Sequence, residues 1–141
     1  MDFTYPINLR FDCNKCGLCC GNTQQKTRHI LLLKSEAKQI ALQTSLPMVE
    51  FSSKAKDNAP YCYEIKKSSE GKCIFLKENQ CTIYEFRPLI CMFYPFQLTF
   101  DNGKRLYVFD FTLECPGINQ VNLFTEKDFE KLFKLAQARL T

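Results

Sequence analysis

The 141-residue sequence lacks the segments by which a chain crosses or enters a membrane. No apolar run approaches the roughly 18 residues that a bilayer-spanning helix needs. The first eleven residues (MDFTYPINLRF) have neither the basic start nor the apolar stretch of a secretory signal peptide. We therefore expect no membrane partner and a reduced, cytoplasmic location, where thiols serve more often as metal ligands or catalysts than as disulfides.

Histidine and glycine-rich loops are also scarce, and both shortages exclude classes of active site. His29 is the only histidine, so no Cys–His nucleophile pair can be assigned, and we expect it to be a surface or cap residue rather than a ligand. No Gly-rich loop follows a strand-like run in the way needed to seat S-adenosylmethionine or a dinucleotide. Repeats, low-complexity tracts and long linkers are absent, which predicts a single domain, 1–141.

Nine cysteines stand out against this background. The first four form Cys13-x2-Cys16-x2-Cys19-Cys20, in which each two-residue gap lets one backbone turn aim neighbouring sulfurs at one centre. Structural zinc sites use C-x2-C pairs, and bacterial ferredoxins wrap a 4Fe–4S cubane with C-x2-C-x2-C. Adjacent side chains in extended backbone point in opposite directions, so we expect Cys19 and Cys20 to serve different sites, or one of them to stay unused.

The other cysteines are dispersed, but four of them have local contexts typical of ligands. Cys73 and Cys81 flank a predicted hairpin, whose two ends would bring their sulfurs together. Cys91 lies between two prolines, in a segment that we expect to form one turn of helix with Cys91 facing inward. Cys115 is followed by proline, as is the last cysteine of the ferredoxin run.

The net charge of +4, from 19 basic and 15 acidic side chains, does not by itself predict nucleic-acid binding. Cysteine must be deprotonated to bind metal, and eight thiolates with two divalent ions would cancel the excess. A loose basic stretch, Lys66, Lys67, Lys72 and Lys77, is more typical of a lysine-protected sheet edge than of a nucleic-acid surface. We therefore do not expect a nucleic-acid partner.

Turn residues predict strands and hairpins in a small α+β fold, with helices packed around the cysteine site. Residues 77–80 and 101–104 separate strand-like runs. They predict two hairpins, 73–76 with 81–84 and 95–100 with 105–111. Further strands are expected over 61–67 and, as a strand or a helix lead-in, over 29–33.

Helices are predicted in three places. One covers Glu36–Thr44 with Ser35 as its N-cap, and a less clear one covers Met48–Lys56. The last begins at Thr125, with Asp128 completing a capping box. Its apolar stripe consists of Phe129, Leu132, Phe133, Ala136 and Leu140.

These motifs resemble the CxxCxxCC cysteine-cluster family, a family of zinc- or iron-chelating domains. The resemblance covers Cys13 to Gly117 and includes five motifs in the family's order. They are CNKCGLCC (13–20), GKCIFL (71–76), CTIYEFRPLIC (81–91), YPF (94–96) and CPG (115–117). Flagellin lysine N-methylase contains a similar cysteine cluster.

The resemblance implies metal binding through the eight cysteines of the family pattern and leaves Cys62 as an extra residue. From the double C-x2-C step we favour a 4Fe–4S iron–sulfur cluster, with zinc as the alternative. The expected ligands are Cys13, Cys16, Cys19, Cys20, Cys73, Cys81, Cys91 and Cys115.

Function beyond metal binding stays open between three classes. The chain could support redox chemistry, metal handling or protein modification; it could be a structural zinc module that binds a protein or nucleic-acid partner; or it could be a methylase-like metalloenzyme with unknown catalytic residues. Arg87 is the candidate cofactor-binding residue, because Pro88 holds its backbone extended and its guanidinium could bind thiolate sulfur or an anion. Pairing with Glu85, Asp110 or Glu114 is the alternative role for Arg87.

Overall fold

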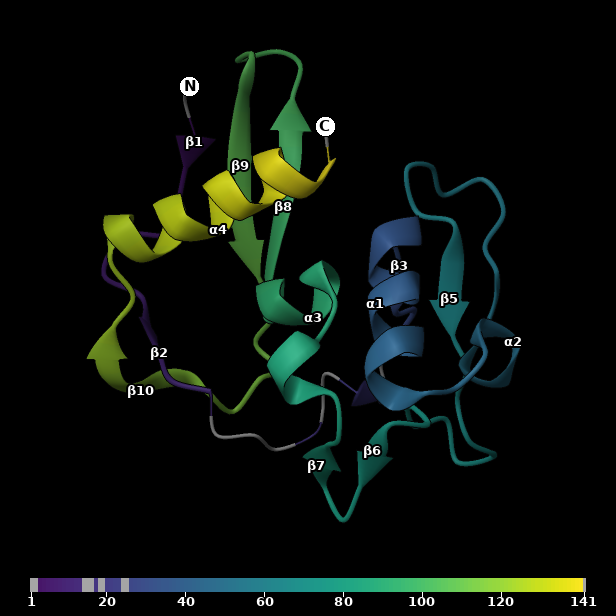
Figure 1. Ribbon diagram of the computed structural model, residues 1–141. Helices are drawn as coiled ribbons and strands as arrows, with labels where there is room; N and C mark the ends of the chain where they lie inside the picture. The colour runs from purple at the N-terminus through teal and green to yellow at the C-terminus, as the bar shows by residue number, and fades with distance from the viewer. Residues whose placement is uncertain (1–2, 14–16, 18–19, 24–25, 141) are drawn as a thin grey trace. The chain divides into compact units, whose positions relative to one another are not determined.

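The computed structural model describes residues 3–13, 17, 20–23 and 26–140. Helices and short strands form an α+β fold, as predicted, and the contacts divide the chain into two compact units (Figure 1). Unit 1 comprises Met1–Asn14 and Phe93–Thr141, and unit 2 comprises Lys15–Met92. None of the described helices is long and apolar enough to cross a bilayer.

Unit 1 contains a three-stranded sheet in the order β1-β9-β8. The predicted hairpin forms its larger part, with β8 and β9 antiparallel and Asp101 opposite Leu106. The Asp101 carboxylate accepts hydrogen bonds from the Gly103 and Lys104 amides at 2.9 and 3.1 Å, which fixes the turn. The edge strand β1 pairs in parallel with β9. The strands are β1 (Phe3–Thr4), β8 (Phe96–Asp101) and β9 (Leu106–Phe111).

Helix α4 (Glu126–Leu140) lies across this sheet (Figure 1). Phe129 and Phe133 are buried, with ring centroids 5.0 Å from Phe109 and 4.9 Å from Phe3, respectively. The predicted stripe therefore packs as expected over most of its length, although Leu140 is 38% exposed at its end.

The predicted capping box starts α4. The Asp128 carboxylate accepts the Thr125 N–H at 2.8 Å, and the Thr125 hydroxyl accepts the Asp128 N–H at 3.4 Å. Beside this helix, β2 (Arg10–Phe11) and β10 (Ile118–Leu123) pair antiparallel.

Unit 2 contains an antiparallel sheet in the order β3-β5-β4. The prediction of a helix over 48–56 was wrong beyond its first turn. Helix α2 ends at Phe51, which is fully buried, and the next residues form β4. They pair with a strand distant in sequence, as in Ser53 opposite Glu64, and this pairing outweighs local helical preference. The elements are β3 (Leu31–Leu32), α2 (Met48–Phe51), β4 (Ser52–Lys54) and β5 (Tyr63–Ile65).

Helix α1 (Lys34–Thr44) starts before the predicted position, and Ser35 is not its N-cap. Leu33 is the N-cap residue, and its N–H donates to Glu36 Oε1 at 2.9 Å. The start of α1 is therefore stabilised by the Glu36 carboxylate, which accepts the Leu33 N–H, and not by Ser35 as an N-cap. Ala37 and Ile40 are buried in the core of unit 2.

The predicted hairpin around 77–80 forms with shorter strands, β6 (Leu76–Lys77) and β7 (Gln80–Cys81). Its turn is Glu78-Asn79, and both residues have positive φ, 50° and 63°. This two-residue turn is the kind that suits the twist of a hairpin. A 3-10 turn, Tyr84–Phe86, and helix α3 (Leu89–Phe93) follow, so the predicted helical turn around Cys91 is confirmed.

Candidate metal centre

The structure describes six of the eight predicted ligands, whereas Cys16 and Cys19 lie outside the described residues. No disulfide joins any two of the seven cysteines that are described. Unit 2 gathers four pattern cysteines in one core: Cys20 and Cys73 are buried members of its hydrophobic cluster, and Cys81 and Cys91 pack against that cluster. The sequence predicted these residues as ligands but not which of them share a core.

Backbone pairing brings Cys20 beside Cys73. The Cys73 N–H donates to the Cys20 carbonyl, and the Asn22 N–H donates to the Gly71 carbonyl at 2.9 Å. Gly71 has φ +77°, and a Cβ there would lie 2.8 Å from Asn22 Nδ2. Glycine is thus required two residues before Cys73 for both its backbone conformation and the close approach of the two segments.

The β6–β7 hairpin brings Cys81 to the same place. Leu76 pairs with Cys81 across the hairpin, and the Leu76 N–H donates to the Cys73 carbonyl at 3.0 Å. A hydrogen bond from the Cys20 thiol is the largest cause that lowers the pKa of the Cys81 thiol to about 6. Burial of Cys81 opposes that effect, and a backbone amide and the Arg87 charge add to it. The geometry therefore favours a thiolate at Cys81 in direct contact with Cys20.

Arg87 lies near the Cys81 thiol, but its guanidinium contacts Tyr84. Its Nη1 donates to the Tyr84 carbonyl at 2.9 Å, and its guanidinium carbon lies 4.1 Å from the centre of the Tyr84 ring. The backbone is extended before the buried Pro88, as predicted. Within the described part of unit 2, Arg87 has no carboxylate at ion-pair distance, so Glu85 does not pair with it. Its charge acts on Cys81 instead.

Glu36 is a supporting residue that the sequence analysis missed. It is 7% exposed, and besides Leu33 it accepts the Leu89 N–H at 2.6 Å. One carboxylate therefore holds the first turns of both α1 and α3, and α3 carries Cys91. A signal existed in the sequence, because glutamate in the first turn of a helix is a typical cap, but its second partner is 53 residues away.

Unit 1 places the first and last cysteines of the pattern on neighbouring segments. Phe11 is opposite Ile118 in the β2–β10 pairing, and the Asp12 N–H donates to the Gly117 carbonyl at 3.0 Å. Because the pairing is antiparallel, Cys13 and Cys115 extend from the same end of it. Cys13 is exposed and Cys115 is 7% exposed.

Gly117 permits this approach, since a Cβ there would lie 2.8 Å from the Phe11 ring. The Asp12 carboxylate also accepts two hydrogen bonds from Asn122, at 2.9 and 2.7 Å, and these lower its pKa. The glycine of the CPG motif is therefore needed for close backbone packing, whereas the cysteine of the motif is an expected metal ligand.

The charge of the chain is concentrated with the thiols. Residues 15–92 contain 12 Lys and Arg against 7 Asp and Glu, a net charge of +5, whereas the rest contains 7 against 8. Six of the eight pattern cysteines also lie in 15–92. The basic excess therefore accompanies the groups that become anionic on metal binding.

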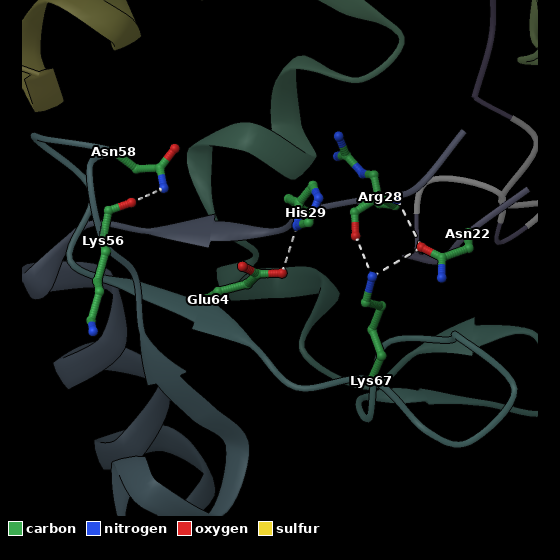
Figure 2. A network of polar contacts seen from close by, with 7 residues as sticks. All are labelled: Asn22, Arg28, His29, Lys56, Asn58, Glu64 and Lys67. Carbon is green, nitrogen blue, oxygen red and sulfur yellow. Dashed lines mark hydrogen bonds and ion pairs between the residues drawn. The ribbon is translucent and has the colours of Figure 1, made fainter. Parts of the chain in front are cut away.

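His29 and Cys62, which are not among the eight expected ligands, have partners of their own. His29 pairs with Glu64 through Nδ1 and Oε2 at 2.9 Å, with its side chain 59% exposed (Figure 2). Cys62 is exposed, and its thiol donates to the Pro60 carbonyl at 3.7 Å. Within the described ranges, which omit Cys16 and Cys19, no group of three or more Cys, His, Asp or Glu side chains is arranged to hold a metal ion.

Comparison with known proteins identifies the family. Residues 12–129 match the family described as "CxxCxxCC: Putative zinc- or iron-chelating domain". The chain belongs to this family. The resemblance predicted from the sequence is thereby confirmed, and family membership supports metal binding by this chain.

A relative from Methanocaldococcus jannaschii, named "Uncharacterized protein MJ0661", is 32% identical over 119 residues. The match covers 81% of this chain and 61% of the relative, so the chain spans about three fifths of that protein's length. No solved structure matches the chain.

Proposed function

We propose that this CxxCxxCC domain holds its metal through the eight pattern cysteines, with a 4Fe–4S cluster as the favoured group. The observation that carries this proposal is the pairwise approach of cysteine-bearing segments: Cys20 lies beside Cys73 and Cys81, and the segment of Cys13 runs along that of Cys115. Segments far apart in sequence meet at the positions that the family pattern marks.

The chemistry of these side chains fits iron or zinc. Thiolates are soft ligands that select zinc and iron–sulfur clusters, whereas magnesium and calcium take oxygen ligands. The described ligands in unit 2 are buried or half-buried against apolar side chains, and the stretch of sequence that contains them, 15–92, has a basic excess. The thiolate form of Cys81 is favoured mainly by the hydrogen bond from Cys20 and, to a smaller extent, by the Arg87 charge, although burial of Cys81 opposes it.

The spacing favours the cluster for the first group of cysteines. Cys13, Cys16 and Cys19 or Cys20 follow the double C-x2-C step by which ferredoxins hold a cubane. A remote cysteine would supply the fourth thiolate, and Cys115 has the following proline that is typical of the last cysteine in the ferredoxin run. When bound, such a cluster would supply one-electron redox chemistry, and the residues of the chain would hold and shield it.

Zinc is the second candidate, and the contact between Cys20 and Cys81 favours it for that pair. Two thiolates on one tetrahedral zinc lie about 3.8 Å apart, given a Zn–S bond of about 2.3 Å. Thiols in direct hydrogen-bonding contact match this arrangement, whereas ligands of different irons in a cubane stand farther apart. A structural zinc ion and an iron–sulfur cluster would together use both sets of cysteines.

We also propose that the domain supports redox chemistry or the modification of another protein, or that it binds a protein partner. The cytoplasmic location is still a prediction from the sequence. A nucleic-acid partner is not proposed, because the basic excess lies in the same stretch of sequence, 15–92, as six of the eight pattern cysteines, whose thiolates would balance it. A methylase-like activity would need a seat for its methyl donor, which the sequence does not indicate.

Anaerobic purification of the native chain, followed by iron, zinc and acid-labile sulfide analysis, tests the proposal. We expect iron and sulfide in equal amounts, with visible absorbance near about 400 nm where such clusters absorb. If the protein contained stoichiometric zinc without sulfide and could not be reconstituted with iron and sulfide, the cluster would be rejected in favour of a structural zinc site. A stably folded chain free of metal would reject both.

A further inference from the structure

One ammonium group joins two of the segments that surround the cysteines of unit 2. Lys67 Nζ donates to Asn22 Oδ1 at 3.0 Å and to the Arg28 carbonyl at 2.8 Å. The same Asn22 oxygen accepts the Arg28 N–H at 2.8 Å, so the three residues form a closed network (Figure 2). The family motifs include none of these three residues, and the sequence predicted for Lys67 only a place on a lysine-protected sheet edge.

Each residue of the network is linked to a pattern cysteine, either by closeness in the sequence or by a backbone contact. Asn22 is two residues after Cys20, and its N–H pairs with the segment before Cys73. Lys67 is itself the bridge partner of Cys73 in the backbone. Arg28 Nη2 donates at 3.4 Å to the carbonyl of Ile90, the residue before Cys91.

We propose that Lys67 is a positioning residue for the metal ligands of unit 2, acting through Asn22 and Arg28. This inference rests on the proposed metal-binding function. Hydrogen bonds to the charged ammonium fix the segment that follows Cys20 against the segment that pairs with Cys73, and Arg28 extends the network to the helix of Cys91. Residues that support ligands from behind typically change metal affinity by about 10- to 100-fold when they are replaced.

The neighbouring lysine offers a matched control. Lys66 is exposed, and its Nζ donates to the Val49 carbonyl at 2.7 Å, at the start of α2. It has the same charge and also bonds a backbone carbonyl, but its contact does not lead to a cysteine. A general effect of removing a lysine from this strand end would therefore appear equally in Lys66→Met and Lys67→Met.

The experiment compares full-length wild-type, Lys67→Met, Lys67→Arg and Lys66→Met proteins, each loaded with Co²⁺, whose thiolate and d–d absorption bands report the number and geometry of sulfur ligands. Competition with a chelator gives the affinity. We expect Lys67→Met to bind about 10- to 100-fold more weakly with shifted bands at saturation, Lys67→Arg to recover much of the loss, and Lys66→Met to match wild type.

The outcomes separate the two proposals. A wild-type chain that binds no Co²⁺ through sulfur would reject metal binding at these cysteines. Tight binding by wild type, with equal affinity and bands in Lys67→Met and Lys66→Met, would overturn only the role of Lys67. A lower melting temperature of Lys67→Met with unchanged bands would also overturn it, because a merely structural lysine would have that effect. Lys67→Gln, which keeps a donor without the charge, replaces the methionine variant if that variant does not fold.

Discussion

The Glu36→Gln substitution tests whether one buried carboxylate holds two helices of unit 2. In the native chain each carboxylate oxygen accepts one backbone N–H, from Leu33 at 2.9 Å and from Leu89 at 2.6 Å. Glutamine has nearly the same shape but only one oxygen. One of the two amides would therefore face an NH₂ group, and both hydrogen bonds would lose the help of the negative charge.

The expected cost follows from these contacts. A hydrogen bond to a charged group contributes about 1.5–3 kcal/mol, and a buried amide left without an acceptor costs about 1–3 kcal/mol. Since the glutamine oxygen retains one bond, we expect a loss of about 2–4 kcal/mol, a large part of the roughly 5–15 kcal/mol by which a domain is stable.

Urea unfolding measures this loss, with Glu50→Gln as the control, because Glu50 is an exposed acid in the first turn of α2. The control should lie within about 0.5 kcal/mol of wild type. Metal content should also fall in Glu36→Gln, since Leu89 begins the helix of Cys91. If the two variants unfolded at the same urea concentration with equal slopes, the assignment of Glu36 as a double cap would be refuted.

Three further predictions concern single residues. Cys62→Ser should keep the full metal content, because Cys62 is exposed and lies outside the family pattern, while Cys73→Ser loses at least one site; equal metal loss by element analysis would reject the distinction. Gly71→Ala should lower the free energy of unfolding by more than about 1 kcal/mol, because φ is +77° and the new Cβ meets Asn22. Gly103→Ala, whose Cβ would meet only the Asp101 carboxylate at 3.3 Å, should cost less, and the reverse order in urea melts would contradict the packing argument. Asp12 has a lowered pKa because it accepts hydrogen bonds from Asn122. Its contribution to stability is therefore present above its unfolded pKa of about 4 and lost as the pH falls through the lower folded value, so Asp12→Asn should flatten the acid side of the stability profile measured by urea melts at several pH values.

Local signals predicted the elements whose causes are local. The turn at Asp101 and the capping box at Thr125 appear in the structure as expected, because each is fixed by side chains within four residues. The helix predicted over 48–56 ends before Ser52, because the backbone from Ser52 onward pairs with β5. Glu36 shows the same limit at the metal centre, because its second amide partner is 53 residues away. Spacing could nominate the cysteines, but only the fold could show that Cys20 meets Cys73 and Cys81.

The family motifs contain glycines as well as cysteines, and the structure gives a reason for two of these glycines. A metal site made from distant segments needs backbones that approach within hydrogen-bonding distance, and a side chain at the crossing point would keep them apart. Gly71 and Gly117 occupy such points, one facing Asn22 and the other facing Phe11. Each lies two residues from a pattern cysteine. The cysteines can therefore bind metal together only if these glycines let the backbones of their segments approach. A chain that keeps all eight thiols but has side chains at 71 and 117 should bind metal poorly.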